Sequence, residues 1–70
     1  MAATKGHTGE ALRTLRKAAG LTLSDVARMA DTAPAYLSKV ECGALIPAEA
    51  YVGRVMAAIA RAFNPEAVAA

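Results

Sequence analysis

The chain has 70 residues, enough for one domain with a small core, and its 8 Lys and Arg against 6 Asp and Glu give a formal net charge of +2. This charge permits a nucleic-acid partner without requiring one. A single cysteine excludes an internal disulfide, and the polar start MAATKGHTGE lacks the apolar run of a signal peptide, so we expect a cytoplasmic protein. No apolar run approaches the roughly 20 residues that span a bilayer.

The N-terminal part of the chain predicts an arm and a first helix. Residues 1–8 show no hydrophobic periodicity, so we expect a flexible arm here and a folded domain over residues 9–70. From Glu10 to Ala19 apolar residues recur on one helical face, and Gly20 is a suitable C-terminal stop. The basic residues of this helix lie mostly on another face and are Arg13, Arg16 and Lys17.

A second helix is predicted almost immediately afterwards. Thr22 is a favourable N-cap, and Asp25, three residues later, can complete a capping box. The apolar stripe contains small residues that permit another helix to approach closely, and it comprises Val26, Ala27 and Ala30. Asp31 follows this stripe, and because Asp tolerates turn conformations, we expect a tight turn there.

The stretch APAYLSKVECG, residues 33–43, predicts a short third helix. Pro34 suits the first helical turn, because the missing N–H of proline costs nothing there. Leu37 and Val40 have the spacing of core residues, and Gly43 is suited to a left-handed C-terminal cap. The outer side chains of this helix are therefore free to meet a partner.

The rest of the chain predicts a loop and a longer helix. Residues 44–47 form the loop, in which Leu45 and Ile46 either fold into the core or contribute a dimer contact. A helix from about Ala48 to Ala62 follows, and Asn64-Pro65-Glu66 can begin a short fifth helix. The apolar residues expected to face the core are Val52, Val55, Met56, Ile59 and Phe63, with Met29 of the second helix. Since no strand pattern occurs, we expect an all-α, compact domain of four to five helices.

Two short helices joined by a tight turn form a helix-turn-helix when they cross steeply, and the second of them can enter the roughly 12 Å wide major groove of DNA. The segments LRTLRKAAGLTLSDVA (12–27) and APAYLSKVECG (33–43), followed by Pro47, resemble the Cro/repressor-type helix-turn-helix family, also called the Xre family. The resemblance implies a lambda-repressor-like domain that binds a double-stranded DNA operator, usually as a homodimer on two half-sites.

The resemblance also implies roles for individual residues. Arg13 and Arg16 would lie beside the DNA backbone, and Thr22 would meet a phosphate through its hydroxyl or N–H group. Arg16 would also form a structural ion pair with Glu41. The full set of DNA-binding positions implied is Arg13, Arg16, Thr22, Pro34, Ala35, Tyr36, Ser38 and Lys39.

Several positions depart from the family pattern and weaken phosphate binding. Leu23 stands where family members often have a phosphate-binding Gln, and Ala33 replaces a Ser or Thr cap. The loop residues 44–46 lack the basic side chains often found there. Sequence discrimination is then expected to depend on Lys39, on apolar contacts with thymine methyl groups and on DNA shape.

We therefore expect a sequence-specific transcriptional regulator, phage-repressor-like, that places the helix at about 34–42 in the major groove. An enzyme, a metal site, a cofactor and a small-molecule ligand are not expected, because the acids are scattered and the only histidine, His7, lies in the expected arm. Two alternatives remain: a protein-interaction module on a helix-turn-helix scaffold, and the antitoxin of a toxin–antitoxin pair. Two of the DNA-binding positions also have a structural alternative: Tyr36 could instead pack over Ala27, and Ser38 could be solvated or bond to the backbone.

Overall fold

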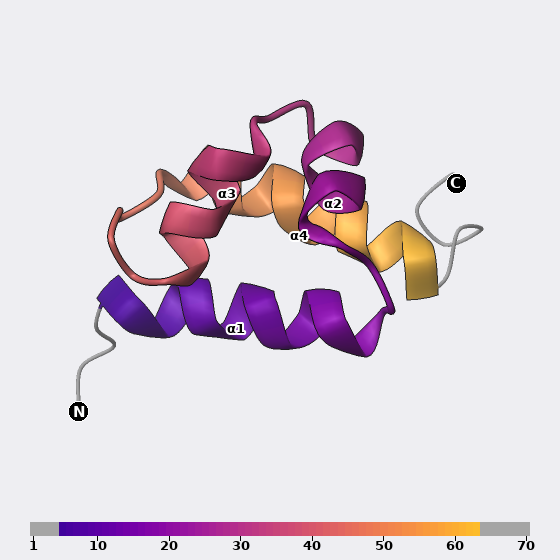
Figure 1. The fold of residues 1–70 in the computed structure, drawn as a ribbon, viewed down its shortest axis with the longest axis horizontal. Coiled ribbons are helices and arrows are strands. Elements are labelled where there is room, and N and C mark those ends of the chain that lie inside the picture. The colour runs from indigo at the N-terminus through magenta and orange to yellow at the C-terminus, as the bar shows by residue number, and fades with distance from the viewer. Residues whose placement is uncertain (1–4, 64–70) are drawn as a thin grey trace.

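Four α-helices form the part of the protein that the computed structural model describes, which is residues 5–63 for the main chain and 8–63 for side chains. In chain order they are α1 (Lys5–Ala18), α2 (Leu23–Met29), α3 (Pro34–Glu41) and α4 (Glu49–Phe63) (Figure 1). No described residue lies in a strand, so the all-α prediction is confirmed. The fifth helix expected near residues 64–66 lies outside the described residues.

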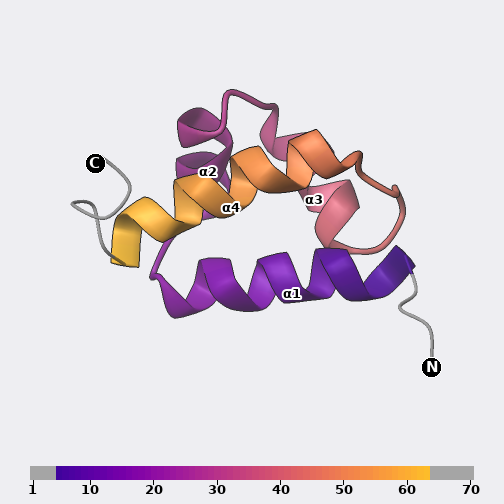
Figure 2. The same cartoon turned by 180° about the vertical axis from the view of Figure 1, so that it is seen from behind.

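The helices surround one core. Figure 2 shows the long helices α1 and α4 running side by side in the same direction, with the short helices α2 and α3 behind them. Helix α2 packs against α4, helix α3 packs against α1, and the two short helices pack against each other. The buried apolar residues come from all four helices and are Leu12, Val26, Ala27, Ala30, Leu37, Val40, Tyr51, Val55, Ala58 and Ile59. No described helix is both long and apolar enough to cross a membrane.

The first helix begins earlier than its sequence suggests. It starts at Lys5 rather than Glu10, so residues 5–8, expected in the arm, are helical. The prediction was wrong here because glycine lowers helix propensity and interrupts the apolar pattern. Gly9 has another reason to be glycine: a β-carbon at this position would overlap the backbone carbonyl of Val40 in α3. It therefore marks a close crossing of two helices.

The predicted caps delimit α2 as expected. Gly20 has a positive φ of 75° and ends the turn after α1. Thr22 and Asp25 form a complete capping box, in which the Asp25 N–H donates to the Thr22 hydroxyl (3.0 Å) and the Thr22 N–H donates to the Asp25 carboxylate (2.9 Å). Hydrogen bonds to the Asp25 carboxylate, first from the Thr22 N–H and then from the Thr22 side chain, are the main reason that the pKa of Asp25 lies below its usual value.

The third helix is fixed at both ends by backbone geometry. Before it, Asp31 adopts a left-handed conformation with φ of 58°, as expected for the tight turn. Pro34 occupies the first helical turn, whereas the N-cap residue Ala33 forms no side-chain hydrogen bond. At the other end Gly43 has a φ of 83°, and its N–H donates to the Val40 carbonyl at 3.0 Å. The short length predicted for this helix is confirmed.

The buried face of α4 differs in part from the one expected. Val55 and Ile59 are buried as predicted, but Met56 and Phe63 are 43% and 56% exposed. Tyr51 and Ala58 are buried in their place, at positions that continue the same three- and four-residue spacing. The prediction was wrong for Met56 and Phe63, because the buried stripe of α4 runs through Tyr51, Val55, Ala58 and Ile59, and neither residue lies on that face. Among the other residues expected in the core, the partly buried ones that pack against it are Met29, Leu45 and Val52.

Candidate nucleic-acid interface

The outer face of α3 is the exposed face of a tightly anchored helix. Leu37 and Val40 on its inner face are fully buried against the other helices. Ala35 and Lys39 are four residues apart and therefore lie on one line along the outer face. The side chains on this outer face are Pro34, Ala35, Tyr36 and Lys39, all exposed, together with the half-buried Ser38. The helix-turn-helix thus presents five of the expected positions on one short rigid element.

Arg16 and Glu41 form a buried ion pair between α1 and the end of α3. The Arg16 Nε lies 2.8 Å from Glu41 Oε2, and Arg16 Nη2 lies 3.0 Å from Glu41 Oε1. The remaining nitrogen, Nη1, donates to the Leu21 carbonyl at 2.9 Å. The two side chains are only 10% and 5% exposed, and the hydrogen bond to the Glu41 carboxylate raises the pKa of Arg16. This bidentate pair fixes the end of α3 relative to α1.

The internal bonds of Arg16 limit the direct DNA contact expected for it. All three of its guanidinium nitrogens donate within the protein, and the side chain is buried. Each of the two Nη atoms carries one further hydrogen, so a phosphate could meet Arg16 only through these two N–H groups, at the groove that Arg16 helps to line. The geometry shows Arg16 holding α3 in place. The family pattern implied both roles, and the ion pair accounts for the structural one.

A shallow groove beside α3 brings together side chains from three helices. Its lining residues are Arg13, Arg16, Leu23, Ser38, Glu41 and Cys42. Of these, Arg13 is an exposed cation, so it can reach a partner at this edge of α3. Thr22 precedes the groove at the start of α2, but its N–H is already bonded to Asp25. Thr22 is exposed, so its hydroxyl group can still face a phosphate.

Tyr36 has a partner that the sequence did not suggest. Its ring packs edge-on against the ring of Tyr51 in α4, with centroids 5.1 Å apart and an interplanar angle of 60°. Tyr36 remains 42% exposed. Tyr51 was missed because it was not recognised as a core position. Its signal was available, since it precedes Val55 and Ile59 by four and eight residues.

The two loop residues Leu45 and Ile46 lie in different surroundings. Leu45 packs against the core, whereas Ile46 is 69% exposed. The loop was expected either to fold into the core or to contribute a dimer contact, and folding into the core describes only Leu45. Leu45 folds inward, and Ile46 is available for an intermolecular contact.

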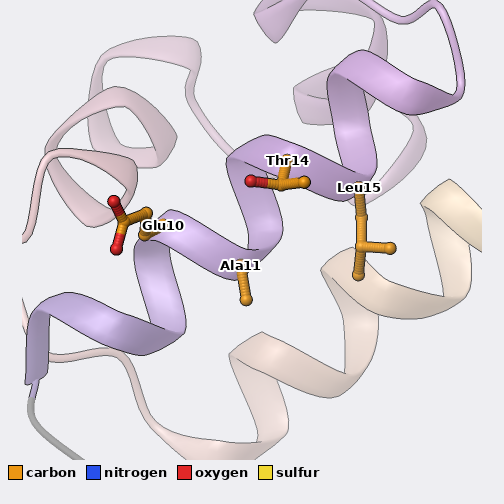
Figure 3. Close-up of a pocket in the computed structure, with 4 residues that line it drawn as sticks. All are labelled: Glu10, Ala11, Thr14 and Leu15. Atoms are coloured by element: carbon orange, nitrogen blue, oxygen red, sulfur yellow. The ribbon is translucent and has the colours of Figure 1, made fainter.

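A second hollow lies beside α1. Figure 3 shows its lining, which consists of Glu10, Ala11, Thr14 and Leu15, all from a single helix. Ala11 and Leu15 point towards the neighbouring part of α4 in this view, and Glu10 is the only ionisable group. Over the described residues no three His, Cys, Asp or Glu side chains gather in a way that could hold a metal ion.

The chain is similar to a known protein family. The family model described as a helix-turn-helix domain matches residues 7–69, which is most of the chain. No curated protein and no solved structure matches the sequence.

Proposed function

Because the chain belongs to the helix-turn-helix domain family of DNA-binding proteins, we propose that it is a sequence-specific transcriptional regulator of the Cro/repressor type. In this proposal α3 enters the major groove of an operator. The observation that carries it is the outer face of α3, which exposes Ala35, Tyr36 and Lys39 while Leu37 and Val40 are completely buried. The major groove is wide enough to admit an α-helix, so an exposed helical face of this kind can reach the base edges.

The proposed contacts divide into base readers and phosphate anchors. Lys39 is the strongest base reader on α3, since a lysine can bond the acceptors of guanine. Ala35 and Tyr36 offer apolar contact with thymine methyl groups. Arg13 and the Thr22 hydroxyl supply phosphate contacts on the flank, and Pro34 and Ser38 border the same surface. With so few cations, a single copy would bind weakly, because phosphate neutralisation dominates affinity.

We propose a homodimer on two half-sites for this reason. Ile46 lies in the loop after α3 and is the most exposed of the large hydrophobic residues described. Its position beside the end of α3 would let a second copy place its own α3 along the same face of the DNA. Ile46→Asp should then weaken dimerisation in sedimentation experiments, whereas Met56→Asp, an equivalent change on exposed α4 surface, should not. Equal effects of the two changes would argue against this contact.

The first experiment is selection of binding sites from a random duplex library, followed by titration of the best site at several salt concentrations. The proposal predicts a motif with two half-sites and an affinity that falls steeply with salt, because counterions are released from the phosphates. No enriched motif together with weak, salt-independent binding would refute it.

The role of Lys39 can be tested with a charge-matched pair of variants. Lys39→Ala should weaken binding to the selected site by about 1–3 kcal/mol and change the preferred base at one position. Lys17→Ala removes the same charge from an exposed position on α1 and should leave the base preference unchanged. A uniform loss across all sequences for Lys39→Ala would make Lys39 a phosphate anchor only.

A second candidate function is a protein-interaction module or an antitoxin. The observation that favours it is the set of exposed apolar side chains, which includes Ile46 and Phe63, together with the modest net charge of +2. Such a module would bind its partner with little dependence on salt. The salt titration above therefore also distinguishes the two functions.

A further inference from the structure

We infer that Tyr51, a residue of α4 that lies beneath the recognition surface, is a positioning residue that sets the base preference of α3 by holding Tyr36. The inference rests on the proposed function and adds a determinant outside the helix-turn-helix itself. It begins from the contacts of Tyr51, which is only 8% exposed and yet touches the exposed ring of Tyr36.

Tyr51 joins α4 to the turn before α3 as well as to α3. The Thr32 hydroxyl donates to the Tyr51 hydroxyl at 3.2 Å, and the Thr32 N–H donates to the Ala27 carbonyl at 2.8 Å. The N-cap residue Ala33 makes no side-chain hydrogen bond at the start of α3. The entry into α3 is therefore held in part by the contact of Thr32 with α4, where a Ser or Thr cap would otherwise act.

The ring of Tyr51 is itself held in place. The guanidinium carbon of Arg54 lies 5.5 Å from its centroid, a cation–π geometry, and Arg54 is one turn further along α4. The ring also makes the edge-on contact with Tyr36. With its hydroxyl bonded, its face covered by Arg54 and its body buried, Tyr51 has little freedom to rotate. It is a fixed support for Tyr36.

A fixed support makes Tyr36 a better reader of DNA. An exposed tyrosine would ordinarily lose side-chain freedom on binding, and that loss opposes affinity. Here the Tyr36 ring is already oriented before DNA arrives. An oriented ring discriminates between bases through contact with a thymine methyl group, whereas a mobile one adapts to any neighbour. The chemistry that Tyr51 serves is therefore readout of the thymine at the base pair that faces Tyr36.

The test measures specificity rather than affinity alone. Sites would be selected with the wild-type protein, and affinities for the best site and for its variants at each base pair would be compared across Tyr51→Leu, Tyr51→Phe and Val55→Ala. Tyr51→Leu removes the supporting ring. Tyr51→Phe keeps the ring and loses the hydroxyl. Val55→Ala is the control, because it damages the buried face of α4 one turn away from the aromatic pair.

We expect Tyr51→Leu to reduce discrimination at one base pair by about three- to tenfold, the effect of losing one aromatic contact, with unchanged binding to unrelated DNA. Tyr51→Phe should retain the discrimination within about twofold, since the edge-on contact persists. Val55→Ala should leave the base preference unchanged. In a Tyr36→Leu background, Tyr51→Leu should have no further effect on discrimination, because the two residues act through one contact.

A wild-type measurement keeps the inference testable if Tyr51→Leu does not fold. Nuclear Overhauser effects between the two tyrosine rings are expected in the free protein and in the complex with the selected site. Their absence in either state would overturn the inference. So would an unchanged base preference in a folded Tyr51→Leu variant. If the wild-type protein selects no motif, the proposed function fails and this inference fails with it. If the wild-type protein selects a motif and the folded Tyr51→Leu variant keeps the same base preference, only the inference is refuted.

Discussion

The two long helices, α1 and α4, are attached to the domain in different ways. In α1, Gly9 brings the backbone of the helix directly against α3, and Arg16 forms a buried bidentate pair with Glu41. In α4, Gly53 has open space where a side chain would lie and Met56 is exposed, and the helix is attached by apolar burial and by the hydrogen bond between Thr32 and Tyr51. The comparison teaches that two helices with similar amphipathic patterns can differ in how closely they pack. An added side chain at Gly9 would overlap the neighbouring helix, whereas one at Gly53 would meet open space.

The largest expected effect comes from breaking the ion pair between α1 and α3. Glu41→Ala leaves the Arg16 guanidinium buried without its partner, so we expect it to lower the free energy of unfolding by about 3 kcal/mol. Glu41→Gln, which keeps the shape and a hydrogen-bond acceptor, should lower it less. Urea denaturation measures both values. A loss below about 0.5 kcal/mol for Glu41→Ala, as is usual for a surface substitution, would show that the contact of α1 is no more specific than that of α4.

Gly9→Ala tests the backbone contact of α1. The added methyl group would overlap the Val40 carbonyl, so α1 and α3 would have to separate, and we expect a loss of about 1–3 kcal/mol. The melting temperature measured by circular dichroism should fall accordingly. A variant as stable as the wild type would mean that this crossing is loose.

Gly53→Ala is the matched change in α4 and should act in the opposite direction. Gly53 lies within the helix with no neighbouring side chain in reach, so alanine removes the entropic penalty of glycine without a clash. We expect a gain of about 0.5–1 kcal/mol in the free energy of unfolding. If both glycine changes destabilised the protein alike, the difference drawn between the two helices would be wrong.

The smallest effect is expected at the exposed face of α4. Met56→Gln replaces a side chain that is 43% exposed by a polar one of similar length, so stability should change by no more than about 0.5 kcal/mol. Thermal denaturation of the two proteins side by side would check this. A loss of several kcal/mol would indicate that Met56 is a core residue, as its spacing in the sequence predicted.

Much of the outer face of α3 could be predicted, because the ends and the buried side of this helix depend on residues close together in the sequence. Pro34 at the start of α3, Gly43 at its end and the spacing of Leu37 and Val40 define the helix and its buried side. The outer face then follows by exclusion. What the sequence could not give was the neighbour of Tyr36, since Tyr51 lies on another helix and either ring could have served as ordinary core.

The sequence by itself determined where most helices end, because caps and turns are local. The Thr22–Asp25 box and the positive φ at Gly20 depend on interactions between residues a few positions apart. Only the tertiary structure decided which face of α4 is buried and why Gly9 is a glycine. It also decided that Arg16 is buried and bonded to Glu41 and to the Leu21 carbonyl. Those outcomes depend on the packing of segments distant in the chain, and hydrophobic periodicity carries no information about which helix will cover which face.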